Sequence, residues 1–189
     1  DCNSARKYWH FIKLMGRSAS HIALECALQT QPNVCLISEE IETKEMSLDD
    51  VVTYIAKIVA DRAADGNNFG TVLIPEGLIE FIPAIKKLIA ELNEVLTDPT
   101  TGESREFANE EEQIDFVKNN IAKDNLAVLE SLPEDVARQL CLDRDPHGNV
   151  QVSLIETEKL LSRMVATKLE AWKEAVSYTH LRAHETRHD

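Results

Sequence analysis

The runs VCLI (residues 34–37) and TVLI (residues 71–74), with the helical stripe between them, decide the fold of this chain. Short continuous apolar runs are typical of strands that are covered on both faces, as in a parallel sheet. Between the runs, Ser47 precedes apolar residues that recur at the 3.6-residue spacing of an amphipathic helix. The stripe consists of Leu48, Val51, Val52, Ile55, Ile58 and Val59. Strand, helix and strand in this order predict a parallel βαβ unit.

The same alternation continues toward the N-terminus. The aromatic and branched run YWHFIKLM (residues 8–15) predicts another strand, which Gly16 ends. A helical pattern follows, and either Ser18 or Ser20 is expected to cap it. The expected apolar surface of this helix consists of Ile22, Leu24, Cys26 and Leu28.

The alternation also continues toward the C-terminus. Pro75 stops the strand at 71–74, and residues 82–96 predict a further amphipathic helix with Pro83 in its first turn. Three strands and three helices joined by short links predict a doubly wound sheet. The expected fold class is therefore α/β, a partial three-layer doubly wound parallel sheet with a mostly helical insertion.

Residues 98–132 differ in composition from what precedes them, with nine acidic residues against three basic ones. Such acidity fits either an interaction surface or a solvated insertion of loop and short helix, and we favour the insertion. LPED (132–135) predicts the start of a short helix, and VQVS (150–153) favours a short strand. Residues 143–149 resemble a turn, because the spacing and final glutamate of a calcium loop are missing.

Four segments follow from these patterns: a partial α/β core over 1–97, an acidic insertion with connecting helices over 98–150, an amphipathic helix over 151–176 and a tail over 177–189. The apolar face of the last helix consists of Leu161, Met164, Val165, Leu169 and Trp172.

The tail contains half of the six histidines, His180, His184 and His188, at intervals of four. On one helical face they would be candidate metal ligands. The string resembles translated adapter sequence, however, so we expect a non-native tail and assign it no role in the fold.

Composition excludes several classes of protein. No stretch approaches the roughly 18 apolar residues that a membrane-spanning helix needs. The net charge of -13 disfavours binding to nucleic acid and to anionic membranes. The cysteines, at positions 2, 26, 35 and 141, lack CxxC spacing, which favours free thiols in a reducing compartment. We therefore expect a cytoplasmic protein with no nucleic-acid partner, no membrane partner and no metal site in this segment.

The charge reverses at the N-terminus, where residues 1–17 carry four cations against the single acid Asp1. Arg17 follows a predicted strand and precedes a predicted helix, at the sheet edge where open α/β folds bind ligands. Helix N–H groups and a guanidinium together suit a phosphate, and Gly16 lets a ligand approach the backbone. The alternative is an ordinary turn with a surface arginine.

Glu76 occupies the equivalent edge after the strand at 71–74, followed by Gly77. A carboxylate there is suited to accept hydrogen bonds from sugar hydroxyls, whereas the alternative is a strand-to-helix turn with an acid near a helix dipole. Because Arg17 and Glu76 follow two strands of one predicted sheet, the pair indicates a sugar phosphate as ligand.

Four stretches, in order, resemble the pyrophosphate-dependent phosphofructokinases: KY (7–8), MGRSASH (15–21), IPEGLIEFIP (74–83) and ETEKLL (156–161). The last stretch and the acidic insertion are similar to the long-chain branch of that family. The resemblance covers roughly residues 1–175.

The resemblance implies roles for six residues. Met15, Gly16 and Arg17 match the fructose 6-phosphate-binding strand end of the family, where Arg17 offsets charge on the transferring oxygens. Glu76 matches the carboxylate that binds sugar hydroxyls. Lys7 and Tyr8 match a pair that reaches the sugar phosphate of a neighbouring subunit, which implies a homo-oligomer.

The family transfers a phosphoryl group reversibly from pyrophosphate to fructose 6-phosphate in glycolysis, with Mg²⁺. The resemblance places its diphosphate loop, magnesium-binding aspartate and aspartate base upstream of this segment. We therefore expect an internal fragment that retains part of the sugar-phosphate half and is inactive by itself.

Two other functions fit the same residues. One is a noncatalytic regulatory subunit of the phosphofructokinase type, and the other is a sugar-phosphate-binding α/β module unrelated to kinases. His10 and His21 could suggest catalysis, but no nucleophile is paired with them by the sequence, so we interpret both as structural.

Overall fold

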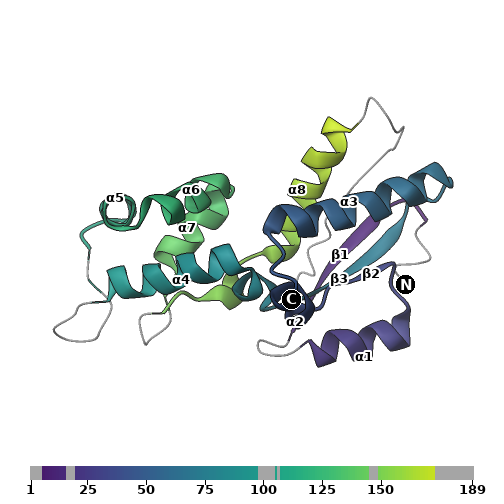
Figure 1. Ribbon diagram of the computed structural model, residues 1–189, viewed down its shortest axis with the longest axis horizontal. Helices are drawn as coiled ribbons and strands as arrows, with labels where there is room; N and C mark the ends of the chain where they lie inside the picture. Colours follow the sequence, from purple (N-terminus) through teal and green to yellow (C-terminus); the bar gives the residue numbers. More distant parts are fainter. Residues whose placement is uncertain (1–5, 16–19, 98–104, 106, 145–148, 173–189) are drawn as a thin grey trace. The chain divides into compact units, whose positions relative to one another are not determined.

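The computed structural model describes residues 6–15, 20–97, 105, 107–144 and 149–172 (Figure 1). The chain divides into two compact units. Residues 1–78 and 157–189 form the first, here called the sheet unit, and residues 79–156 form the second, here called the helical unit.

The sheet unit is built on three parallel strands in the order β1-β3-β2, which are β1 (Trp9–Leu14), β2 (Val34–Cys35) and β3 (Gly70–Pro75). The three strands expected over 8–15, 34–37 and 71–74 are confirmed. The helices of this unit are α1 (His21–Thr30), α2 (Ser38–Thr43), α3 (Leu48–Ala64) and α8 (Thr157–Ala171).

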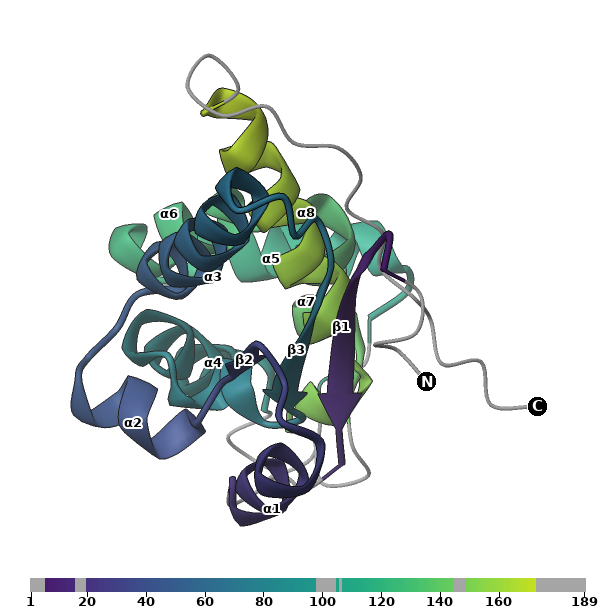
Figure 2. The same ribbon diagram turned by 90° about the vertical axis from the view of Figure 1, so that its right-hand side faces the viewer.

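Helices cover both faces of the sheet. The chain passes from β1 over β3 to β2 through α1, and it returns from β2 to β3 through α3. Because parallel crossovers are right-handed, these opposite directions place the two helices on opposite faces. Figures 1 and 2 show α1 on one side of the strands and α3 with α8 on the other. This arrangement confirms the three-layer doubly wound class.

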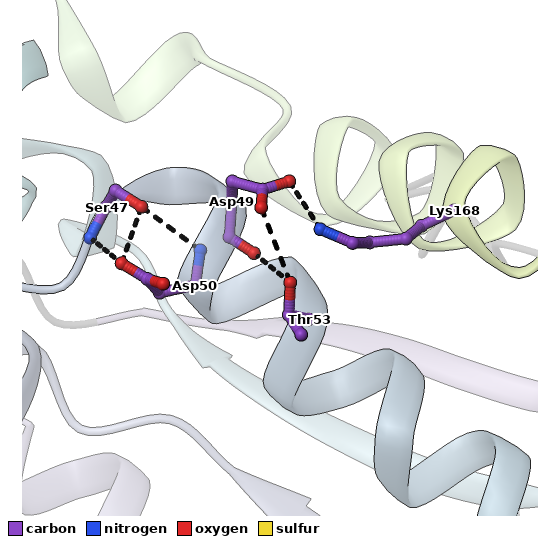
Figure 3. Close-up of polar contacts among 5 residues, drawn as sticks. All are labelled: Ser47, Asp49, Asp50, Thr53 and Lys168. Atoms are coloured by element: carbon purple, nitrogen blue, oxygen red, sulfur yellow. Dashed lines mark hydrogen bonds and ion pairs between the residues drawn. The ribbon is translucent and has the colours of Figure 1, made fainter.

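The helix α3 forms where the sequence predicts it, although Leu48 and Ile58 of the expected stripe are only half-buried. The hydroxyl of Ser47 accepts a hydrogen bond from the Asp50 amide at 3.2 Å, and the Ser47 amide donates to Asp50 Oδ2 at 3.0 Å, forming a capping box (Figure 3). Lys168 Nζ of α8 lies 2.6 Å from Asp49 Oδ1. The buried stripe of α3 consists of Val51, Val52, Ile55, Ala56, Val59 and Ala60.

The sheet packs closely at the start of β3. Gly70 lies opposite Trp9 of β1, and Trp9 is almost fully buried. A Cβ atom on residue 70 would come within 2.5 Å of Trp9 Cζ3. Only a glycine therefore fits this position beside the indole.

The expected apolar surface of α1 is wrong. Its side chains are exposed at Ile22 (42%), Leu24 (52%) and Leu28 (68%), and α1 buries Ala23 instead. Residues two apart lie on different sides of a helix, so the alternating hydrophobics cannot all face the sheet. Small residues at a spacing of three and four, Ala23, Cys26 and Ala27, provide the less exposed stripe.

Two short elements also differ from expectation. The sequence analysis missed α2, which follows β2 directly and buries Ile41. The expected strand over 150–153 is wrong, because Val150 makes only an isolated bridge to Arg144 and the 3-10 helix η2 (Val152–Leu154) follows.

The helical unit contains two short 3-10 helices: η1 (Leu78–Phe81), apart from its first residue Leu78, and η2. Its α-helices are α4 (Pro83–Leu96), α5 (Glu110–Asn120), α6 (Lys123–Ser131) and α7 (Glu134–Leu142). Glu91 of α4 accepts hydrogen bonds from the Ala122 amide at 2.7 Å and Asn125 Nδ2 at 2.5 Å. The expected mostly helical insertion is confirmed, and it buries apolar side chains such as Val117 and Leu129.

By its contacts, α4 belongs to the helical unit. The sequence instead led us to expect α4 in the segment over 1–97. The segment boundaries drawn from composition stay predictions. Among the described residues, no helix is both long and apolar enough to cross a bilayer. The tail at 177–189 lies outside the described residues.

Candidate functional site

The candidate site begins where β1 and β3 end. Leu14 lies opposite Pro75 in the parallel register, and the Glu76 amide donates a hydrogen bond to the Leu14 carbonyl oxygen at 2.9 Å. Met15 and Glu76 therefore leave the same edge of the sheet on adjacent strands. Met15 is 78% exposed, and Glu76 is half-buried. An exposed apolar residue and a carboxylate at the same sheet edge suit a ligand with an apolar face and hydroxyl groups.

Gly16 and Arg17 follow Met15 but lie outside the described residues, so their expected roles stay predictions. The description resumes at Ser20, which is buried and stands immediately before α1. The expected cap at Ser20 is only half right, because Ser20 is the N-cap residue but its hydroxyl makes no capping bond to its own helix.

Lys7 and Tyr8 lie at the opposite end of β1. Lys7 is exposed, Tyr8 is half-buried, and the Tyr8 carbonyl accepts a hydrogen bond from the Gly70 amide at 3.2 Å. Six strand residues at about 3.3 Å each separate this pair from Met15, a span of roughly 20 Å. The structure therefore brings Met15 and Glu76 together and keeps Lys7 and Tyr8 away from them.

The end of β2 adds residues that the sequence analysis missed. The Ser20 amide donates a hydrogen bond to Glu39 Oε1 at 2.9 Å, and the Ser38 amide donates to Ser20 Oγ at 2.8 Å. Both serines are buried, at 3% and 2% exposure. Glu39 is the second residue after VCLI, as Glu76 is the second residue after TVLI. This parallel is the sequence signal that could have indicated Glu39 as a residue of the same sheet edge.

These bonds change the electrostatics at the start of α1. The hydrogen bond from the Ser20 amide, with weaker contributions from other hydrogen bonds and from His21, lowers the pKa of Glu39. Glu39 therefore carries its negative charge at neutral pH beside the N-terminal end of the helix, where a charge of that sign is favoured. The Ser20 amide is already bonded and is not available to a phosphate, so an anion there must rely on other donors.

Lys13 precedes the site on β1 and contacts the start of α8. Its Nζ lies 3.7 Å from Glu158 Oε2, and both side chains are largely buried, at 26% and 16% exposure. One of the four cations counted over residues 1–17 is therefore matched by an acid. Glu158 belongs to the stretch 156–161 that carries part of the resemblance.

The described residues contain no group of three or more histidine, cysteine, aspartate and glutamate side chains that could hold a metal ion.

A separate cleft of about 460 Å³ lies within the helical unit, lined by residues of α5, α6 and α7. Its wall contains acids such as Glu111 and Glu134, the cations Lys118 and Arg138, and the buried Cys141.

No protein-family model matches the chain. Curated proteins named pyrophosphate–fructose 6-phosphate 1-phosphotransferase are similar to it over most of its length. The protein from Porphyromonas gingivalis is 63% identical over 174 residues, which are 92% of this chain and 31% of that protein. The protein from Treponema pallidum is 52% identical over 95% of this chain and 31% of its own length.

Plant subunits are also similar. The subunit beta 2 of Arabidopsis thaliana is 48% identical over 94% of this chain and 30% of its own length. The chain thus spans about a third of the length of the curated relatives that it matches. Within that third, its sequence is 48–63% identical to these three proteins named pyrophosphate–fructose 6-phosphate 1-phosphotransferase.

Proposed function

We propose that this chain is the sugar-phosphate-binding segment of an enzyme that transfers a phosphoryl group from pyrophosphate to fructose 6-phosphate. The observation that carries the proposal is the meeting of Met15 and Glu76 at one sheet edge, joined by the bond between the Glu76 amide and the Leu14 carbonyl. Relatives that are 47–63% identical carry this activity in their names, which supports the assignment.

In the proposed reaction, O1 of the sugar attacks the nearer phosphorus of pyrophosphate. The bond from that phosphorus to the bridging oxygen breaks, phosphate leaves, and fructose 1,6-bisphosphate forms. The O1 proton passes to a carboxylate base that this segment does not supply. Such transfers depend on positioning and on stabilisation of the charge that spreads over the transferring oxygens.

The four residues at the strand ends have defined roles in the proposed reaction. Glu76 accepts hydrogen bonds from sugar hydroxyls and fixes the sugar on the edge of the sheet. Met15 packs against the apolar face of the sugar, and Gly16 lets it approach the backbone. Arg17 donates hydrogen bonds to anionic oxygens and offsets their charge in the transition state.

Lys7 and Tyr8 have a different part. The family resemblance assigns them to the sugar phosphate bound to a neighbouring subunit in a homo-oligomer, and their separation from Met15, roughly 20 Å along β1, is compatible with that role. Mg²⁺ would neutralise the pyrophosphate when bound, on residues outside this segment. The free cysteines Cys26, Cys35 and Cys141 suit a cytoplasmic location.

A chimera tests the proposal directly. This chain replaces the matching third of the Porphyromonas gingivalis relative, and fructose 1,6-bisphosphate is measured with pyrophosphate as the donor. We expect pyrophosphate-dependent product from the chimera and none from the 189-residue chain alone, since that chain lacks the base. A folded chimera that forms no product would contradict the proposed function, and product from the purified chain alone would contradict its assignment as a partial site.

A further inference from the structure

Two of the described cysteines lie in the sheet unit, on elements that contact each other. Cys26 belongs to α1 and Cys35 ends β2, and both are half-buried free thiols. The remaining described cysteine, Cys141, is buried in the helical unit. Cys26 and Cys35 have no part in the proposed phosphoryl transfer, so their placement on neighbouring elements points to a different chemistry.

The Cys35 side chain lies against the backbone of α1. Its Sγ donates a hydrogen bond to the Ala23 carbonyl oxygen at 3.6 Å, and a second acceptor, the Leu36 carbonyl oxygen, lies 3.8 Å away. Because successive side chains of a strand point to opposite faces, Cys35 faces α1 and Val34 faces the other side of the sheet. The Cys35 thiol is therefore held between its own strand and the helix.

Cys26 lies one helical turn after Ala23. Residues three apart on an α-helix are neighbours on its surface, with Cβ atoms about 5–6 Å apart. Ala23 is buried and Cys26 is half-buried, whereas Leu24 and Glu25 between them are exposed. Cys26 therefore shares with Ala23 the side of α1 that covers the sheet, next to the carbonyl group that Cys35 contacts.

The electrostatics agree with this proximity. Burial in the first place, and the nearby Cys26 thiol in the second, raise the pKa of the Cys35 thiol. A raised pKa keeps Cys35 protonated at neutral pH. Because the thiolate is the reactive form of a cysteine, Cys26 is the thiol that we expect to react first with an oxidant.

We propose that Cys26 and Cys35 are a modification site, at which a peroxide converts the two thiols into a reversible disulfide. The bond would tie α1 to the end of β2 within the sheet unit. Disulfides in a reducing compartment are usually transient and redox-sensing, so this site would respond to an oxidant. The inference is independent of the proposed function, because it involves neither substrate and is tested on the 189-residue chain.

The reaction consumes one peroxide. The Cys26 thiolate attacks one oxygen of hydrogen peroxide, the O–O bond breaks, and the leaving hydroxide takes the proton that Cys26 released and becomes water. Cys26 is then a sulfenic acid. The Cys35 sulfur attacks the sulfenic sulfur, the S–O bond breaks, and the oxygen leaves with the Cys35 proton as a second water. The two thiols together lose two electrons, which reduce the peroxide.

Peptide mapping of the 189-residue chain tests the site. The reduced chain is treated with hydrogen peroxide, its remaining thiols are alkylated, and it is cut after lysine and arginine. Both cysteines are then released on one peptide, residues 18–44. We expect this peptide to lose two hydrogens and to take up no alkylating agent. The disulfide should be at least about tenfold more abundant than in the untreated chain, and a thiol reductant should reverse it.

Serine variants locate the bond. Cys26→Ser and Cys35→Ser should each abolish it. Cys141→Ser is the matched control and should leave it unchanged, because Cys141 is buried in the helical unit and burial raises the pKa of its thiol. Loss of the disulfide in Cys141→Ser would overturn the inference.

Thermal unfolding shows whether the bond fits the folded chain. A disulfide that is compatible with the native geometry restricts the unfolded chain, so the oxidised chain should have a Tm at least about 2 °C above that of the reduced chain. Peroxide-treated Cys26→Ser is the control, and its Tm should not rise. A Tm of the oxidised chain that stays the same or falls would show that the native structure does not accommodate the bond, and would overturn the inference.

The other outcomes of the mapping are also decisive. An unchanged peptide 18–44, or Cys26 oxidised to a sulfinic acid with Cys35 still free, overturns the inference, because the two thiols then do not meet. A disulfide from Cys26 to Cys2 or to Cys141 overturns it as well. Each of these results leaves the proposed function standing, and an inactive chimera leaves the disulfide site standing.

Discussion

The Glu76 amide and the Leu14 carbonyl oxygen are 2.9 Å apart, and their hydrogen bond continues the parallel ladder one residue past the end of β3. This bond fixes Glu76 relative to the strand that leads to Met15. Met15 and Glu76, 61 positions apart in sequence, thereby leave the sheet on adjacent strands at one edge.

Glu76 is the residue at this edge whose role is most directly testable. In the chimera, Glu76→Ala should raise KM for fructose 6-phosphate by at least about tenfold, while kcat falls less than about threefold. Recognition of a hydroxyl is lost equally in the ground state and the transition state, so binding suffers more than turnover. Steady-state kinetics against fructose 6-phosphate measure this, with Glu94→Ala on the exposed side of α4 as the control. A fall in kcat with constant KM would contradict the role.

Gly70→Ala tests the close packing of β3 against β1. The new methyl group would meet the Trp9 ring at 2.5 Å, and overpacking of this kind costs about 1–3 kcal/mol. Urea unfolding of the chain measures the loss. Gly66→Ala is the control, because residue 66 has open space around it and only a φ of +79° to strain an alanine, at about 1 kcal/mol. A Gly70→Ala variant more stable than Gly66→Ala would contradict the packing argument.

The capping box of α3 predicts a dependence of stability on pH. The side-chain and backbone hydrogen bonds with Ser47 lower the pKa of Asp50 in the folded chain (Figure 3). The stabilisation is therefore present above the unfolded-state pKa and is lost as the pH falls through the lower folded-state pKa. Asp50→Asn should remove that acid-dependent part of the unfolding free energy, measured by urea unfolding between about pH 5 and pH 2.

Two further variants complete that experiment. Asp61→Asn, in the last turn of the same helix, should keep the parental pH dependence. Ser47→Ala should lower stability by about 1 kcal/mol at neutral pH, the usual cost of losing a cap. An Asp50→Asn variant with the same acid dependence as the parent would show that the box does not carry it.

The sequence was sufficient to predict those strands and helices whose apolar residues form a continuous run or recur at a regular spacing. Continuous apolar runs located β2 and β3, and the apolar stripe after Ser47 located α3. The segment 38–43 has one apolar residue that becomes buried, Ile41, so no period marks α2. Since α2 was not expected, the hydrogen bond between the Ser20 amide and Glu39 could not be expected either.

The position of residues on a face was harder to predict than the elements themselves. Ile22, Leu24 and Leu28 are strongly apolar, yet the small Ala23 is the buried residue of α1. Small side chains let a helix approach the sheet closely, and hydrophobicity alone does not record that preference. The pairing of Leu14 with Pro75 also depends on strand order, which no local pattern encodes.

Deletion of residues 177–189 tests the prediction that this tail is foreign to the fold. We expect Tm to stay within about 2 °C of the parent chain, because the tail has no apolar stripe to contribute to the core. A loss of about 1 kcal/mol would lower Tm by roughly 2–4 °C in a chain of this size. A fall of several degrees in a thermal scan would therefore contradict the prediction.

Arg17 carries the prediction that bears most on the chemistry. If its guanidinium offsets the charge that develops on the transferring oxygens, Arg17→Ala in the chimera should lower kcat by about tenfold to a hundredfold, or roughly 1.4–3 kcal/mol of transition-state stabilisation. Arg17→Lys keeps the charge but loses the planar fork of donors, so it should restore only part of the rate. Arg138→Ala, which removes an exposed arginine paired with Glu110, should leave kcat unchanged. Normal kcat and KM for both substrates in Arg17→Ala would show that the strand end after β1 is not part of the reacting site.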